Sequence, residues 1–359
     1  MSLKFDLKNI ISHFDIEGEL LFATPFGDGH INDTFLVEIK DKKNEVTKYT
    51  LQRINTYVFK EPDKVMENIL AITSHIKDKL SEDDFFTTYT VMKSKSGTPY
   101  YIDENNNFWR MQTFIDHVIV YDHSQDEKVV YNAAKGFGKF AYYLSDFDLS
   151  NLHDTIPNFH NFKVKYQDLV NAFEQDSKCR AKEVKEQFSF YRSFETEFGI
   201  LEQCHLPKRV THNDTKLNNI LLDEKTNLPV AVIDLDTVMS GLIATDFGDS
   251  IRSISGKEGC KSLSQIQFSP TSFEHYAKGY LEQTREILTK EEVDVLPLGV
   301  KLISLSLGMR FLTDYLNGDV YFKTDYPQHN LDRALSQIKL AQEFDKNQST
   351  MSKIIHQYI

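Results

Sequence analysis

The chain has 359 residues, of which 40% are apolar, 12% aromatic and 26% charged, a composition typical of globular proteins and not of disordered or fibrous ones. Its 41 basic and 53 acidic residues give a formal net charge of −12, which argues against non-specific binding to nucleic acid or to anionic membranes. Three widely spaced cysteines (Cys179, Cys204 and Cys260), the lack of an N-terminal secretion pattern and the lack of an apolar run of ~20 residues predict a cytoplasmic protein with free thiols.

The first third of the chain predicts a small antiparallel lobe. A short lead-in helix is expected within residues 5–20, and a second helix begins near Pro62, which suits a first helical turn. The expected strands are 20–26, 34–39, 49–54, 86–92 and 108–114. We therefore predict a five-stranded lobe over residues 1–115, followed by a hinge near Phe114.

The rest of the chain, residues 116–359, is predicted to be mainly helical. Apolar residues at helical spacing mark 127–145, and amphipathic charged segments cover about 161–200. Two short strands over 210–236, joined through 223–228, interrupt the helices. Further helices are expected at 271–288, 291–317 and 330–345, with Pro297 kinking or dividing the second of these.

One polar loop between apolar runs carries a catalytic constellation. Residues 210–222 read VTHNDTKLNNILL, and a Val/Ile strand then ends at Asp234. Asp214 is placed to accept a proton from a substrate hydroxyl, while Asn219 and Asp234 offer two oxygen ligands to a magnesium ion that also binds nucleotide phosphates. His212 is better placed to brace the loop than to act as the base. This pattern predicts phosphoryl transfer.

The same residues resemble the signature of the aminoglycoside phosphotransferase and choline kinase superfamily, which has a protein-kinase-like fold. Further motifs resemble the N-acetylhexosamine 1-kinases within it: GDGHIN from Gly27, LQRIN from Leu51, DFGDSIR from Asp246, GMRFL from Gly308 and GDVYF from Gly318. The resemblance implies a bilobal α+β fold, with an N-terminal lobe that covers ATP and a C-terminal lobe that carries the metal and sugar sites.

The resemblance also implies the roles of individual residues. Asp214 matches the catalytic base, and Asn219 and Asp234 match the Mg²⁺ ligands. The implied sugar-binding residues are His30, Asp214, Arg310 and Tyr321, with Asp236 and Thr237 as weaker candidates. An Arg and a Tyr suit a neutral N-acetyl sugar, whereas a cationic acceptor requires carboxylates or an aromatic cage.

The nucleotide site departs from the protein-kinase pattern. The turn with Gly27 and Gly29 has fewer glycines than a phosphate-binding loop and is equally consistent with an ordinary hairpin turn. The third strand lacks the usual lysine, so Arg53 is the candidate for the ATP phosphates, although it could equally face solvent. Phe114 is expected near the backbone groups that bind the nucleotide base.

Two supporting roles each have an alternative. Asp249 or Asp246 is expected to brace the catalytic loop, through His212 or through Arg252, with direct binding of the metal as the alternative. Lys216 could neutralise charge on the transferred phosphate or could simply be solvated.

The sequence thus predicts an ATP-dependent kinase that forms the α-1-phosphate of N-acetylglucosamine or N-acetylgalactosamine, as a monomer or weak oligomer. One alternative is a kinase of the same fold that acts on an amino alcohol, a homoserine-like amino acid or an aminoglycoside. A catalytically silent nucleotide-binding protein is disfavoured because Asp214, Asn219 and Asp234 are all present.

Overall fold

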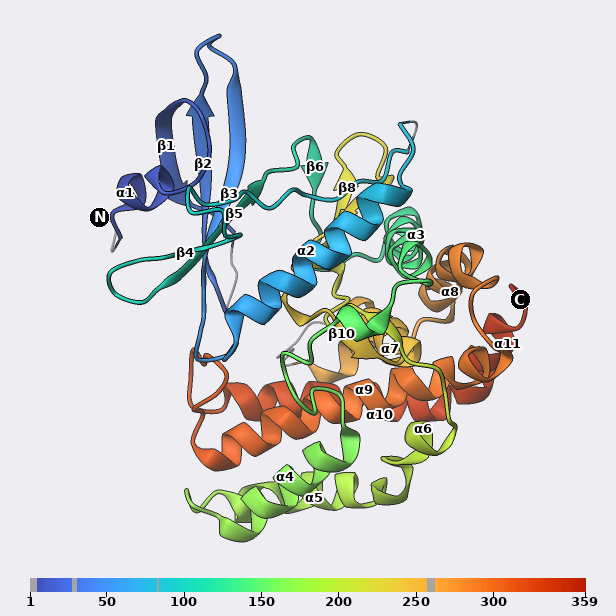
Figure 1. Ribbon diagram of the computed structural model, residues 1–359. Helices are drawn as coiled ribbons and strands as arrows, with labels where there is room; N and C mark the ends of the chain where they lie inside the picture. Colours follow the sequence, from blue (N-terminus) through green and yellow to red (C-terminus); the bar gives the residue numbers. More distant parts are fainter. Residues whose placement is uncertain (1–4, 28–30, 83, 257–261) are drawn as a thin grey trace. The chain divides into compact units, whose positions relative to one another are not determined.

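The structure is a computed structural model that describes residues 5–27, 31–82, 84–256 and 262–359 (Figure 1). The chain forms two compact units. The first runs to Val118 and includes Ser150–Ile156, and the second comprises Ile119–Leu149 and Pro157–Ile359. The predicted bilobal α+β class is confirmed.

A five-stranded antiparallel sheet forms the centre of the first unit, in the order β1-β2-β3-β5-β4 (Figure 1). Its strands are β1 (Glu19–Pro25), β2 (Asp33–Lys40), β3 (Val46–Ile54), β4 (Tyr101–Ile102) and β5 (Phe108–Thr113). Alternating apolar residues explain this sheet, since Phe35, Val37 and Ile39 of β2 are all buried on one face. They pack in a cluster that includes the apolar face of α1 (Leu7–Ser12), which is shorter than the helix expected within 5–20.

The predicted strand over 86–92 is wrong. This segment makes an isolated bridge between Val91 and Gln112, with hydrogen bonds from the Met92 N–H to the Met111 carbonyl (2.8 Å) and from the Thr113 N–H to the Thr90 carbonyl (2.9 Å). These contacts with β5 are too few for a ladder, and the Phe108–Trp109 end of the same edge of β5 pairs with β4 through Tyr101 and Ile102. The sheet therefore has the expected number of strands with a different fifth member.

Helix α2 (Pro62–Lys79) has Pro62 in its first turn, as expected, and buries an apolar face that includes Ile69 and Ile72. Its Asn68 holds the distant segment Ser150–Ile156 in the first unit. The Asn68 amide donates to the His153 carbonyl (2.9 Å), and the His153 N–H donates back to the Asn68 Oδ1 (2.8 Å). The sequence did not predict this return of the chain.

The second unit is built mainly from helices (Figure 1). They are α3 (Glu127–Tyr143), α4 (Phe162–Gln175), α5 (Lys185–Arg192), α6 (Ile200–Gln203), α7 (Ile243–Ser255), α8 (Pro270–Thr284), α9 (Lys290–Asn317), α10 (His329–Lys346) and α11 (Gln348–Ile355). Helices α3 and α8 pack together, and α9 packs against α7 and α10. Gly248 of α7 lies so close to Gly299 of α9 that a Cβ at position 248 would be 2.6 Å from the Gly299 carbonyl oxygen, which explains the glycine of the DFGD motif.

Helix α9 is one continuous helix of 28 residues, so Pro297 does not divide it. A capping box formed by Thr289 and Glu292 begins the helix, and Gly318, at φ 97°, ends it in the left-handed conformation. The helix is long and apolar enough to cross a membrane by length and composition alone. However, 78% of its most apolar window is buried in this unit, as in the core helix of a folded domain.

The remaining strands are the boundary strand β6 (Val118–Ile119) and two antiparallel pairs. Strand β7 (Arg209–Thr211) pairs with β10 (Met239–Gly241), and β8 (Ile220–Asp223) forms the predicted hairpin with β9 (Pro229–Val232). The catalytic loop predicted from the sequence connects β7 to β8.

Candidate active site

The catalytic loop begins on a strand that is tied to the helical core. Arg209 of β7 donates to both carboxylate oxygens of the buried Glu292 (2.6 and 2.8 Å) and to the Ile287 carbonyl (2.6 Å). The loop ends in a single 3₁₀ turn, Leu217–Asn219, before β8. Both ends are thus held by regular structure, so the loop has a defined course.

His212 is fully buried and spans the loop. Its Nε2 lies 2.8 Å from the Ile233 carbonyl oxygen, and its Nδ1 accepts the Asp214 N–H (3.3 Å). Because Nδ1 accepts, Nε2 carries the proton. Backbone groups use both ring nitrogens, one in the loop and one just after β9, which is the geometry of a bracing residue and not of a proton acceptor for substrate.

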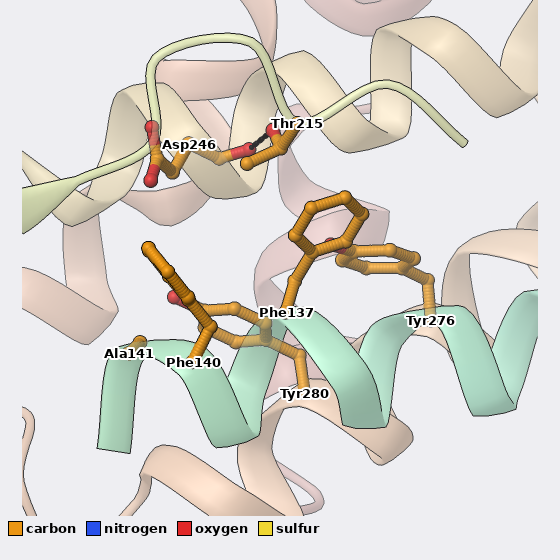
Figure 2. Close-up of a pocket in the computed structure, with 7 residues that line it drawn as sticks. All are labelled: Phe137, Phe140, Ala141, Thr215, Asp246, Tyr276 and Tyr280. Atoms are coloured by element: carbon orange, nitrogen blue, oxygen red, sulfur yellow. Dashed lines mark hydrogen bonds between the residues drawn. The ribbon is translucent and has the colours of Figure 1, made fainter. Parts of the chain in front are cut away.

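Asp246, in the first turn of α7, holds the catalytic loop through hydrogen bonds. Its carboxylate accepts the N–H groups of His212 (2.6 Å) and Asn213 (2.8 Å), and Thr215 Oγ1 donates to its carbonyl (2.6 Å). Figure 2 shows Asp246 and Thr215 above the small pocket lined by Phe137, Phe140, Ala141, Tyr276 and Tyr280. Of the two aspartates that the sequence left open, Asp246 makes these bonds, whereas Asp249 binds Arg252 Nε (2.8 Å).

Burial raises the pKa of Asp246 to about 6, against the opposing effects of His212 and the two backbone N–H donors. Because the folded-state pKa lies above the ordinary 3.8, ionisation of Asp246 costs stability as pH rises from about 4 to about 6, by about 3 kcal/mol. We expect the free energy of unfolding of the wild type, relative to Asp246→Asn, to fall over this pH range and to level off above it. Denaturant titrations at several pH values measure this difference, and a pH-independent difference would contradict the assignment.

Asp214 is the partly exposed carboxylate at the centre of the loop. Lys216 Nζ lies 2.9 Å from its Oδ1 and 3.2 Å from its Oδ2, and the Asn219 amide donates to Oδ2 (3.2 Å). Burial raises the pKa of Asp214, but the ammonium of Lys216, which also donates a hydrogen bond, and the guanidinium of Arg252 outweigh it, so the pKa lies below the ordinary value. Asp214 is therefore ionised at neutral pH and able to orient a hydroxyl and accept its proton.

The predicted metal ligands Asn219 and Asp234 lie at adjacent positions of the β8–β9 hairpin. The Ile233 N–H donates to the Asn219 carbonyl (2.9 Å), and Asp234 follows directly, exposed and in the left-handed conformation (φ 60°). The Asn219 amide nitrogen turns to the Asp214 carbonyl (2.8 Å), and its Oδ1 accepts no hydrogen bond within the described part of the chain. An amide oxygen beside a carboxylate fits Mg²⁺.

Among the described residues, no group of three or more His, Cys, Asp or Glu side chains could hold a metal ion. A Mg²⁺ ion at Asn219 and Asp234 would therefore depend on substrate phosphates and water for its remaining ligands, as is usual for this ion.

The weaker sugar candidates Asp236 and Thr237 lie in the 3₁₀ turn after Asp234. Asp236 is buried, and Thr237 Oγ1 donates to the His212 carbonyl (2.7 Å). The Thr237 carbonyl accepts the Asn213 amide (2.8 Å). Thr237 thus contributes to the loop framework, and a contact of either residue with sugar stays a prediction.

The structure brings Arg310 and Tyr321 together near the end of α9. The Arg310 guanidinium lies 5.9 Å from the centre of the Tyr321 ring, 5.1 Å from that of Phe159 and 5.5 Å from that of Phe322. Tyr321 is about half exposed, at 49%. The guanidinium can donate hydrogen bonds to polar groups of a ligand, and the rings provide an apolar surface for the rest of it.

His160 connects this aromatic cluster to the catalytic loop and was not singled out by the sequence. Its ring centre lies 4.6 Å from that of Phe159, and its Nε2 lies 3.2 Å from the Asn213 carbonyl oxygen. Burial and the charge of Arg310 lower the pKa of His160 to about 3. The only local signal is its place just before Asn161, which caps α4, and that signal says nothing about catalysis.

The segment that carries Tyr321 is held by one buried carboxylate. Asp314 accepts the consecutive backbone N–H groups of Val320 (2.9 Å), Tyr321 (2.8 Å) and Phe322 (2.9 Å), and it also accepts the Asn330 amide (2.8 Å). Tyr321 is therefore exposed on a backbone with a defined conformation.

In the first unit, the nucleotide candidate Gly29 and the sugar candidate His30 lie outside the described residues. Gly27 adopts a positive φ of 73°, which favours glycine, and the Phe26 and Phe114 rings meet edge to face at 5.5 Å. These positions are compatible with the predicted roles.

Arg53 already has partners in its own unit. Its Nε donates to Asp33 Oδ2 (2.7 Å), its NH1 group donates to Asn107 Oδ1 (3.2 Å), and its guanidinium lies over Phe5. Arg110 of β5, a buried cation that the sequence did not suggest, donates to Gln52 Oε1 (2.9 Å). Since Gln52 and Arg53 alternate along β3, Arg110 lies on the sheet face opposite Arg53.

The model of the phosphotransferase enzyme family (APH) matches residues 23–287, which is 265 of the 359 residues. The chain belongs to this phosphotransferase family. The matched region runs from β1 to just beyond α8 and includes Asp214, Asn219 and Asp234. Arg310 and Tyr321 lie beyond it.

Several solved structures share the fold of this phosphotransferase. An aminoglycoside phosphotransferase from Alicyclobacillus acidocaldarius has a TM-score of 0.61 at 12% identity, over 99% of this chain and 98% of that one. A microcompartment-associated aminopropanol kinase has a TM-score of 0.57 at 14% identity, over 96% and 98%. Amicoumacin kinase hAmiN, in complex with AMP-PNP, Ca²⁺ and Ami, has a TM-score of 0.58 at 11% identity, over 94% of each chain. At such identities the likeness establishes the fold alone.

Proposed function

We propose that this phosphotransferase is an ATP-dependent kinase that phosphorylates the anomeric 1-hydroxyl of N-acetylglucosamine or N-acetylgalactosamine to the α-1-phosphate. The observation that carries the proposal is the cluster of Arg310, Tyr321 and Phe159, which His160 joins to the loop of Asp214. We further place the enzyme in the cytoplasm, where free thiols such as those of Cys179 and Cys204 stay reduced.

In the proposed reaction, the ionised Asp214 orients the anomeric hydroxyl and accepts its proton. The sugar oxygen attacks the γ-phosphorus of ATP in line, and the bond from this phosphorus to the bridging oxygen of ADP breaks. A Mg²⁺ ion bound by Asn219 and Asp234 would neutralise charge on the phosphates. Lys216, held 2.9 Å from Asp214, is placed to attract the same phosphate charge.

The charges around Arg310 favour a neutral acceptor. Lys165 of α4 lies near enough that burial and the charge of Arg310 both lower the Lys165 pKa. In the part of the chain that the structure describes, neither cation forms an ion pair with a carboxylate. A protonated amine would be repelled by two such cations, whereas a neutral sugar with hydroxyl and amide groups would not.

The second candidate function is phosphorylation of an amino alcohol, a homoserine-like amino acid or an aminoglycoside. The structural relatives include an aminoglycoside phosphotransferase and an aminopropanol kinase, which supports this class of acceptor. The unpaired Arg310 opposes it, because a cationic acceptor needs a carboxylate or an aromatic cage free of competing cations.

A panel of acceptors tests the proposal. We expect ATP consumption with N-acetylglucosamine or N-acetylgalactosamine and a product phosphorylated at C1 in the α configuration, identified by phosphorus and proton NMR. We expect a far smaller rate with ethanolamine, aminopropanol, homoserine and kanamycin. Turnover confined to the cationic acceptors would establish the second candidate instead.

A further inference from the structure

The two ring nitrogens of His160 differ in their contacts: Nε2 binds the catalytic loop and Nδ1 does not. A carbonyl oxygen can only accept, so the contact from Nε2 to the Asn213 oxygen (3.2 Å) places the proton on Nε2. Nδ1 is then a lone-pair acceptor, and it has no hydrogen-bond partner among the residues that the structure describes. Since the His160 pKa is about 3, the ring keeps this neutral form at physiological pH.

Arg310 presents the complementary group. Its contacts in the described ranges are with the rings of Phe159, Tyr321 and Phe322, so its N–H donors form no hydrogen bonds there. The Phe159 ring contacts both residues, with its centre 5.1 Å from the Arg310 guanidinium and 4.6 Å from the His160 ring centre. One acceptor and a set of donors thus flank the same apolar ring.

This combination matches a secondary amide. An acetamide has one carbonyl acceptor, one N–H donor and a methyl group that favours an apolar surface. A sugar hydroxyl at the same position could donate to Nδ1 and accept from Arg310 through one oxygen, but it has no methyl group for the Phe159 ring. An ammonium would be repelled by Arg310. An amide therefore uses every group that the cluster offers.

We propose that His160 and Arg310 form a subsite for the acetamide of the acceptor, in which Arg310 donates to the carbonyl oxygen and His160 Nδ1 accepts the amide N–H. The inference rests on the proposed function and makes His160 a specificity-determining residue. The Phe159 ring would cover the methyl group. The contact with Asn213 fixes the orientation of the imidazole relative to the catalytic loop.

Two substitutions separate the two nitrogens of His160. In His160→Gln the terminal amide nitrogen takes the place of Nε2 and can still donate to the Asn213 carbonyl, while the Nδ1 acceptor is lost. In His160→Asn the side-chain amide takes the place of Nδ1, while the bond to Asn213 is lost. A purely structural histidine would be rescued by Gln and not by Asn.

The experiment compares kcat/KM for N-acetylglucosamine with that for glucose in the wild type, both variants and a control, His123→Gln, at an exposed histidine of the same unit. We expect His160→Gln to lower the preference for N-acetylglucosamine by about tenfold, as for one lost hydrogen bond. We expect His160→Asn to retain most of the preference and to lower kcat for both sugars. The control should have the wild-type kcat/KM for both sugars.

Two negative results are distinguishable. A wild-type enzyme that phosphorylates N-acetylglucosamine, with the same preference in His160→Gln, would overturn the acetamide subsite alone. A wild-type enzyme that phosphorylates neither N-acetylhexosamine would overturn the proposed function and the subsite with it.

Discussion

Replacement of Asp214 by asparagine is expected to lower kcat by a factor on the order of 10² or more, as for the loss of a positioned general base. The carboxylate lies 2.9 Å from Lys216 Nζ and accepts the Asn219 amide, so an asparagine of the same shape fits the position without removing bulk. The loop itself is held by His212 and Asp246, which the substitution does not touch. Folding and ATP binding should therefore be retained.

The matched control is Glu224→Gln, the same change of acid to amide in the exposed turn of the β8–β9 hairpin. Steady-state kinetics with saturating ATP, calorimetric binding of ATP and a thermal unfolding curve measure the three properties. Turnover of Asp214→Asn within a few-fold of the control would remove Asp214 from the role of base.

Replacement of Asp314 by alanine is expected to lower the free energy of unfolding by about 2 to 4 kcal/mol and to raise the KM of the acceptor more than that of ATP. The substitution leaves the N–H groups of Val320, Tyr321 and Phe322 without their common acceptor. The segment that presents Tyr321 would then lose its defined conformation.

Asp314→Asn should have an intermediate effect, because one oxygen can still accept two of the three N–H groups. Asp325→Asn, at an exposed carboxylate just beyond the same segment, is the control. Denaturant unfolding and acceptor kinetics report the two effects. Equal increases in the KM of both substrates would show that Asp314 supports the unit in general and not the acceptor segment in particular.

The parts of the fold that the sequence predicts are those with a long regular pattern. The β1–β2–β3 meander and helices α2 and α3 follow from alternation or helical spacing over many residues. The run 86–92 has the composition of a strand, but only its last three residues reach the backbone of β5, and that arrangement is set by the tertiary fold and not by the local sequence. A two-residue strand such as β4 is too short to show any pattern.

In the candidate site, too, some residues can be predicted from the local sequence and others cannot. Asp214, Asn219 and Asp234 are close because a hairpin of short connections joins them, and such proximity can be predicted from spacing. His160 and Arg110 are single polar residues whose partners are distant in sequence, and nothing next to them indicates those partners. The choice of Asp246 over Asp249 depended on which carboxylate faces the loop, and that is set by the packing of α7.

The segment Ser150–Ile156 makes the first unit discontinuous in sequence. The chain passes between the units after Val118, after Leu149 and after Ile156, so a fragment cut at the end of the first unit's main segment is not the whole unit. Such a fragment would lack the backbone groups of His153, which satisfy both ends of the buried Asn68 amide. The unit would have to be produced by tethering Ser150–Ile156 to its end through a designed linker, or by coexpression of both segments.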